Sequence, residues 1–185
     1  MRVAEIRREN NPYAYFADLR YLPFWAGSLT LIGAAPGIGK TSWLLSMTAD
    51  AAALNIPSAL ACYEHTQEEL FYRLKKQATA EVYGVHHSLS SRDNGSSDVE
   101  LRLAKYANAL FLSLDDREDT IYAIEKTLLE YGFPEYGRAF LAVDYLQRIP
   151  VVGSYGLIQQ DIRPGEAAAA LRKMARKHQW SLAVA

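Results

Sequence analysis

The stretch from Ser28 to Thr41, SLTLIGAAPGIGKT, is the feature that most constrains how this 185-residue chain can fold. A short apolar run leads into a glycine-bearing turn and then into Lys40 and Thr41, an order that predicts a strand, a phosphate-binding loop and the start of a helix. Residues 34–41 fit the P-loop (Walker A) pattern G-x-x-x-x-G-K-[ST], except that Ala34 stands at the first glycine position.

The residue types in this loop suit a nucleoside triphosphate bound together with Mg²⁺. Glycine lets the backbone wrap a phosphate with its N–H groups pointing inward, and the N-terminus of the following helix adds partial positive charge. Lys40 is placed to neutralise the β- and γ-phosphates, and the Thr41 hydroxyl to ligate Mg²⁺. The alternative is a glycine-rich turn that binds nothing. The predicted nucleotide-binding residues are Ala34, Ala35, Pro36, Gly37, Ile38, Gly39, Lys40, Thr41 and Ser42.

Composition places the chain among ordinary globular proteins. Half of its residues are hydrophobic, 22% are charged and the formal net charge is −1, which does not support a strongly basic footprint for nucleic acid. Cys62 is the only cysteine, so a disulfide framework is excluded and a reducing compartment is expected. The sequence has no signal-peptide pattern and no apolar run of membrane-spanning length, so we expect a cytoplasmic protein that makes no membrane contact.

Continuous apolar runs alternate with helical patterns along the rest of the chain, which predicts an α/β fold with a mostly parallel sheet. Beyond the first strand, the expected strands cover residues 58–63, 109–114, 138–144 and 180–185. The expected helices cover residues 40–54, 67 onward, 99–107, 119–131 and 164–178. Polar, turn-rich sequence over 83–98 predicts a loop, and 150–163 is expected to be irregular. The basic run from Arg172 to His178 is best explained by a favourable interaction with the helix dipole and by exposure to solvent. A contact with nucleic acid is the second interpretation.

Two acidic residues follow buried strands at the edge of the sheet where parallel α/β folds bind their ligands. Asp144 ends the strand over 138–144, where it can hold Mg²⁺ opposite the Thr41 hydroxyl, directly or through water. Glu64 follows the strand over 58–63. The capping box Thr66-x-x-Glu69 accounts for Glu69 but not for Glu64, which on position alone is equally well a solvated acid.

We expect residues 1–25 to form an N-terminal arm or linker and residues 26–185 to form the folded domain. An aromatic group marks the arm. It either packs against one edge of the core or contacts a nucleotide base or a neighbouring subunit. Its members are Tyr13, Tyr15, Phe16, Tyr21, Phe24 and Trp25.

Three segments, LTLIGAAPGIGKT, ACYEHTQEEL and LAVDYLQRIP, together resemble the RecA-type ATPase core of the replicative hexameric DNA helicases, the DnaB family. The phosphate loop of that family also tends to begin with alanine. The Asp-Tyr-Leu-Gln strand end is the most specific of the three matches, and the likeness covers residues 26–185. It implies a RecA-like P-loop NTPase with three αβα layers.

The resemblance also implies roles for individual residues. Lys40 and Glu64 would be catalytic, with Glu64 polarising the attacking water, while Thr41 and Asp144 would hold Mg²⁺ beside ATP. Gln147 would lie near the site as a sensor. The segment over 151–163 would face single-stranded DNA in a central channel, with Arg148 and Arg163 as its main positive charges. The implied partners are ATP, single-stranded DNA, and further copies of the chain or a partner ATPase subunit.

The sequence also departs from the family. The family's later strands, one of which carries an arginine finger, and its N-terminal helical domain have no counterpart within these residues. We therefore expect a fold that lacks the C-terminal strands and an isolated chain that turns ATP over slowly or not at all. The alternative function is a nucleotide-binding scaffold or regulatory module. A small-molecule P-loop kinase would leave Glu64 unexplained.

Overall fold

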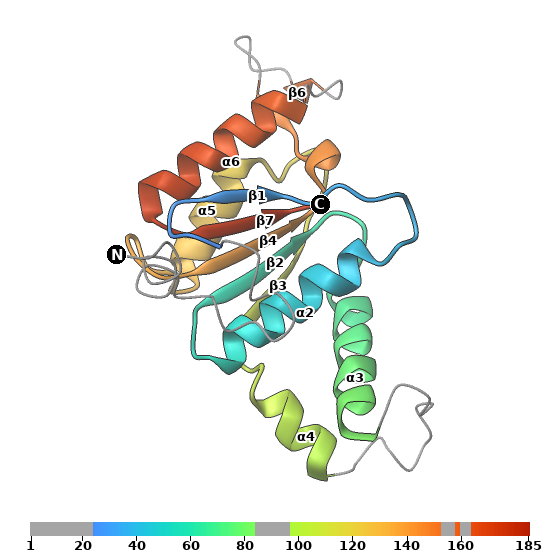
Figure 1. Ribbon diagram of the computed structural model, residues 1–185. Helices are drawn as coiled ribbons and strands as arrows, with labels where there is room; N and C mark the ends of the chain where they lie inside the picture. The colour runs from blue at the N-terminus through green and yellow to red at the C-terminus, as the bar shows by residue number, and fades with distance from the viewer. Residues whose placement is uncertain (1–23, 84–96, 153–157, 160–163) are drawn as a thin grey trace, which may run out of the picture.

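A computed structural model describes residues 24–83, 97–152, 158–159 and 164–185, and its centre is a parallel sheet (Figure 1). The five strands lie in the order β1-β7-β4-β2-β3, and every neighbouring pair is parallel. Their bounds are β1 Leu29–Leu31, β2 Ser58–Cys62, β3 Ala109–Ser113, β4 Phe140–Asp144 and β7 Ser181–Val184. The predicted α/β class with a parallel sheet is confirmed.

Helices cover both faces of the sheet, which gives the three layers expected from the sequence (Figure 1). The helices on one face are α2 Lys40–Ala53, α3 Gln67–Tyr83 and α4 Ser97–Ala104, and those on the other are α5 Ile121–Glu130 and α6 Pro164–His178. Alternate residues of β4 divide between the two cores. Phe140 and Ala142 pack with the α2 side, while Leu141 and Val143 pack with the α5 and α6 side. Burial on both faces explains why the strands read as continuous apolar runs.

The start of one helix follows from a capping residue that is visible in the sequence. Helix α5 begins after Thr120, whose hydroxyl accepts a hydrogen bond from the Ala123 N–H at 3.2 Å. Helix α4 begins at Ser97, two residues before the predicted start, while the predicted loop over 83–98 lies mostly outside the described residues.

The prediction that residues 150–163 are irregular is wrong in part. Two short strands, β5 Val151–Val152 and β6 Ile158–Gln159, pair antiparallel there. β-Branched residues stand on both sides of a glycine-containing turn sequence, a pattern that favours a hairpin. The 3₁₀ turn η3, Leu146–Arg148, joins this hairpin to β4.

Only the last two residues of the predicted N-terminal arm lie within the described part of the chain. Phe24 is fully buried, and its ring lies edge-on to Phe140 with the ring centroids 5.7 Å apart. The end of the aromatic group therefore packs on the core, as the first of its two interpretations required. The remaining aromatic residues of that group lie outside the described residues.

The sequence predicts that the basic residues at the end of α6 face solvent. This prediction is wrong for His178, which is buried. Its Nδ1 lies 2.5 Å from the backbone carbonyl oxygen of Glu135, and its Nε2 lies 2.6 Å from the Glu125 carboxylate. Lys177 donates to the same carboxylate at 2.7 Å. Burial opposes the charged form of Glu125, but the hydrogen bonds from Lys177 and His178 outweigh it, so the pKa of Glu125 is lowered. This cluster joins α6 to α5.

We expect Glu125→Gln to lower the free energy of unfolding by about 2 kcal/mol at pH 7, because it weakens two charge-assisted hydrogen bonds at a mostly buried site. The contribution of a carboxyl with a lowered pKa is present above its unfolded pKa of about 4.3, and it is lost as the pH falls through the folded value. Urea unfolding from pH 7 down to the lowest pH at which the chain folds should show the deficit shrinking. Glu130→Gln is the matched control on the same helix, at an exposed ion pair with Lys126, and should change stability by less than about 0.5 kcal/mol. A deficit that persists unchanged at low pH would contradict the charge-based explanation.

Candidate nucleotide-binding site

The loop between β1 and α2 has the backbone that the sequence predicts. Gly37 and Gly39 have φ angles of 79° and 96°, in the left-handed region that side chains rarely adopt. Gly39 is also the N-cap of α2, so no side chain caps that terminus and its first N–H groups open toward the loop. Residues 33–39 are exposed to solvent. An open helix N-terminus behind a glycine-bearing loop suits an anion.

The first turn of α2 places Lys40 and Thr41 at this loop. The ammonium of Lys40 donates to the backbone carbonyl oxygens of Ala34 and Ala35, at 3.1 Å and 3.3 Å. The side chain thus reaches back across the loop toward β1. A cation held at the loop can neutralise the charge of a phosphate that approaches it.

Asp144, at the end of β4, meets Thr41 from the other side. The Thr41 hydroxyl donates to Asp144 Oδ2 at 2.6 Å, although 103 positions separate the two residues in the sequence. Asp144 is only 2% exposed, so the hydroxyl partners an otherwise buried carboxylate. The predicted pairing of these two residues at one point of the fold is therefore present.

The donor chemistry at Thr41 and Asp144 fits Mg²⁺. Oxygen ligands such as hydroxyl and carboxylate are those that Mg²⁺ prefers, and the Thr41 and Asp144 oxygens are close enough together that both would be able to hold one ion. Within the described residues, no group of three or more His, Cys, Asp or Glu side chains can hold a metal. Mg²⁺ usually takes one or two protein ligands and completes its shell with phosphate and water, so two ligands suffice.

Cys62 is a member of the site that sequence reasoning missed. It lies opposite Asp144 in the register of β2 and β4, and its Sγ is 3.8 Å from Asp144 Oδ2. Burial raises the pKa of the Cys62 thiol to about 11, so it stays protonated at neutral pH. Its position near the end of the predicted strand before Glu64 was the available signal.

Glu64 lies two residues beyond β2, at the same edge of the sheet as Asp144. The N–H of Tyr63 donates to the Asp144 carbonyl oxygen at 2.8 Å, which fixes the two strand ends side by side. The predicted capping box forms, with Glu69 N to Thr66 Oγ1 at 3.3 Å and Thr66 N to Glu69 Oε2 at 3.0 Å. Glu64 itself is exposed, and its carboxylate makes no hydrogen bond or ion pair to another described residue. It is available to a ligand.

The residues predicted to be a sensor or to face DNA divide into three cases. Gln147 is exposed in η3, just beyond Asp144. Arg148 is held within the chain, because its Nη1 lies 2.8 Å from Asp116 Oδ2 and its Nε donates to the Tyr145 hydroxyl at 3.1 Å. That ion pair was not foreseen. Arg163 lies outside the described residues.

A parallel sheet with a glycine loop after one strand, and with carboxylates at the ends of two other strands that are adjacent to each other, is typical of a RecA-like α/β domain. The sequence model of the DnaB-like helicase C-terminal domain matches residues 18–184, and the chain belongs to that family. The resemblance noted in the sequence is confirmed at this level.

Solved structures agree on the fold. The structure of a DnaB-like replicative helicase and its interactions with primase superposes with a TM-score of 0.68 at 18% identity, over 87% of this chain and 39% of that one. A second solved structure, that of an ATPase domain, superposes with a TM-score of 0.66 at 19% identity, over 86% and 57% of the two chains. This chain therefore spans less than two thirds of either. Comparison with the curated proteins finds no match. In the described part of the chain, no helix is both long and apolar enough to cross a bilayer.

Proposed function

We propose that this domain binds ATP with Mg²⁺ at the loop over 34–42 and hydrolyses it as part of a motor that acts on single-stranded DNA. The observation that carries the proposal is the 2.6 Å contact between Thr41 and Asp144 beside the Lys40 ammonium. A hydroxyl from the loop helix and a carboxylate from the end of another strand are the two protein ligands that P-loop enzymes offer to Mg²⁺. Membership of the DnaB-like family supports the same assignment.

Each residue has a defined task in this proposal. The loop over 34–39 cradles the phosphates with its backbone N–H groups, which every residue except Pro36 supplies, and Lys40 neutralises the phosphate charge. Thr41 and Asp144 hold Mg²⁺, which would offset the negative charge that develops on the phosphate oxygens. Glu64 orients the attacking water and accepts its proton, a task that suits an exposed carboxylate with no described partner.

The DNA contact in this proposal lies beyond β4. Gln147 lies in η3, within the six residues that join the end of β4 to the hairpin of β5 and β6, so movement at the nucleotide can reach the hairpin through this short segment. Arg148 is engaged by Asp116, so phosphate would have to compete with that ion pair. We propose that assembly with further copies or a partner ATPase subunit completes a site whose loop and Glu64 are open to solvent.

The test is ATP turnover measured against protein concentration, with and without single-stranded DNA. The rate per chain should rise with both, because a neighbouring subunit and the nucleic-acid track each complete the active assembly. The measurement is steady-state phosphate release at saturating ATP and Mg²⁺. Tight ATP binding with a flat rate near zero under all conditions would instead support the nucleotide-binding scaffold.

A further inference from the structure

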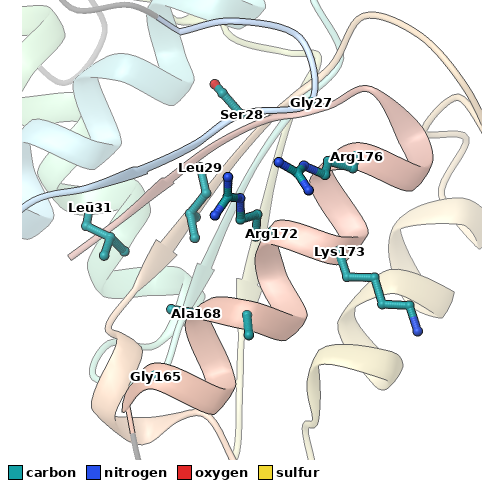
Figure 2. Close-up of a pocket in the computed structure, with 10 residues that line it drawn as sticks. Gly27, Ser28, Leu29, Leu31, Gly165, Ala168, Arg172, Lys173 and Arg176 are labelled. Carbon is teal, nitrogen blue, oxygen red and sulfur yellow. The ribbon is translucent and has the colours of Figure 1, made fainter.

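Helix α3 is fastened to the first turns of α2 by the side-chain amide of Gln77. Gln77 Nε2 donates to the Ser42 carbonyl oxygen at 3.1 Å and also to the Ser46 hydroxyl. Ser42 directly follows Thr41, so the contact lies one residue from a predicted Mg²⁺ ligand. It lies on the α2 face of the sheet, away from the groove of about 780 Å³ between β1 and α6, which shares no residue with α2 or α3 (Figure 2).

The chemistry of this contact fixes which way the Gln77 amide faces. A backbone carbonyl oxygen can only accept, and the Ser46 hydroxyl already donates its proton to the Ser42 carbonyl oxygen at 3.0 Å. Both groups therefore need a donor from Gln77, and the amide nitrogen must point toward α2. Gln77 Oε1 is then left buried, without a hydrogen-bond partner among the described residues.

Packing alone does not account for a glutamine at this position, because a buried acceptor without a partner lowers stability. The buried stripe of α3 consists of Leu70, Leu74 and Ala78, and Gln77 lies on the same side of the helix. An apolar side chain of similar length would fill the space and remove the unpartnered oxygen. What glutamine adds here is a hydrogen-bond donor to the first turns of α2.

The N-terminus of α3 is tied closely to Glu64. Only His65 and Thr66 separate Glu64 from the first residue of the helix, and the capping box between Thr66 and Glu69 holds that turn. The His65 Nδ1 atom lies 3.3 Å from the same Glu69 carboxylate. Because this connecting segment is short and hydrogen-bonded, a displacement of α3 would change the position of Glu64 relative to the phosphate-binding loop.

We propose that Gln77 is a positioning residue that couples the phosphate-binding loop to Glu64 by holding α3 against the first turns of α2. Ordering of the first turn of α2 around a bound nucleotide reaches α3 through this contact, and α3 then holds Glu64 in place for the attacking water. The coupling is reciprocal, so a fixed α3 also stabilises the turn that carries Lys40 and Thr41. This inference rests on the proposed function and adds to it a link between nucleotide binding and the carboxylate that activates water.

The first test measures backbone hydrogen exchange with and without Mg²⁺ and the non-hydrolysable ATP analogue AMPPNP. In the parent chain, the analogue should slow exchange in the loop over 34–39 and also, by about threefold or more, in residues 70–78 of α3. Gln77→Met keeps the length of the side chain but has no donor. In this variant the loop should still be protected, while α3 should exchange as it does without the analogue. Gln77→Lys supplies a donor of similar reach and should restore the protection of α3.

Gln77→Met should fold as the parent chain does. The Ser42 carbonyl oxygen keeps the Ser46 hydroxyl as a donor, and the unpartnered Gln77 oxygen is removed. The midpoint of thermal unfolding should therefore move by less than about 4 °C. The matched control is Lys76→Met, which introduces the same side chain at an exposed position one residue earlier. This control should keep the exchange pattern and the turnover of the parent chain.

The second test separates a positioning role from a general loss of structure. ATP turnover of Gln77→Met should fall about tenfold or more, while its affinity for AMPPNP stays within about threefold of the parent. Because Gln77 acts through Glu64, the same substitution should cause no further loss of turnover in a Glu64→Gln background. Single-turnover phosphate release measures these rates at the protein and DNA concentrations that give the parent chain its highest rate.

A protected loop beside an unprotected α3 in the parent chain would overturn the inference, as would equal protection of α3 in Gln77→Met and the parent. An equal loss of turnover in the Glu64→Gln background would exclude a role through Glu64. Loss of AMPPNP affinity in Gln77→Met would assign Gln77 to the construction of the phosphate-binding loop instead. Failure of the parent chain to bind AMPPNP is a different result, because it would overturn the proposed function on which the inference rests.

Discussion

Replacement of Lys40 by alanine is expected to weaken binding of Mg²⁺–ATP at least a hundredfold, about 3 kcal/mol. The Lys40 ammonium is held over the loop by the Ala34 and Ala35 carbonyl oxygens, where an entering phosphate would replace two neutral acceptors with charged ones. Hydrogen bonds between two charged groups are roughly twice as strong as neutral ones, and here the partner carries several negative charges. Titration calorimetry with ATP and Mg²⁺ measures the loss.

The matched control for this variant is Lys126→Ala, which removes an exposed lysine from the opposite face of the sheet. It should bind ATP as the parent chain does, since its only described ion pair is with Glu130. A thermal unfolding profile unchanged from the parent would show that Lys40→Ala acts on the ligand and not on folding. Parental ATP affinity in Lys40→Ala would overturn the assignment of the loop.

The sheet was predictable because its strands and the site use strong local signals. Continuous apolar runs and Gly-x-Gly-Lys spacing depend on neighbouring residues alone, so β2, β4 and the loop before α2 appear where the sequence places them. The proximity of Asp144 and Thr41 could be predicted from the sequence, because the carboxyl ends of parallel strands lie at one edge of the sheet. The order of the strands was not predictable in this way, since it depends on long-range packing.

The features that were missed depend on contacts between distant elements. His178 reads as a solvent-facing base in the sequence, but Glu125 of α5 and the Glu135 backbone enclose it once the two helices pack. Arg148 likewise looks like an unpaired cation in the sequence. Its ion pair with Asp116 exists because the segment after β3 lies beside η3 in the fold. Hydrophobic periodicity carries no information about such partners, because a charged side chain at a surface position looks the same whether or not another charge faces it.

Glu64→Gln is expected to reduce ATP turnover at least a hundredfold while leaving ATP affinity within about twofold of the parent. The amide keeps the size and shape of the carboxylate but cannot accept a proton from the attacking water. Because Glu64 is exposed and has no described partner, the substitution should cost little stability. Phosphate release is measured at the protein and DNA concentrations that give the parent its highest rate, and affinity is measured by calorimetry.

The control for Glu64→Gln is Glu68→Gln, an equal loss of charge at an exposed acid in the first turn of α3. It should retain turnover within about threefold of the parent, because the Glu68 carboxylate is engaged at the N-terminus of α3, where it hydrogen-bonds to the Thr66 side chain. Asp144→Asn should differ from both, losing Mg²⁺-dependent affinity together with turnover, since it removes charge from the contact with Thr41. Equal turnover in Glu64→Gln and the parent would exclude Glu64 as the base. Loss of ATP affinity in Glu64→Gln would instead place Glu64 among the groups that bind the ground state.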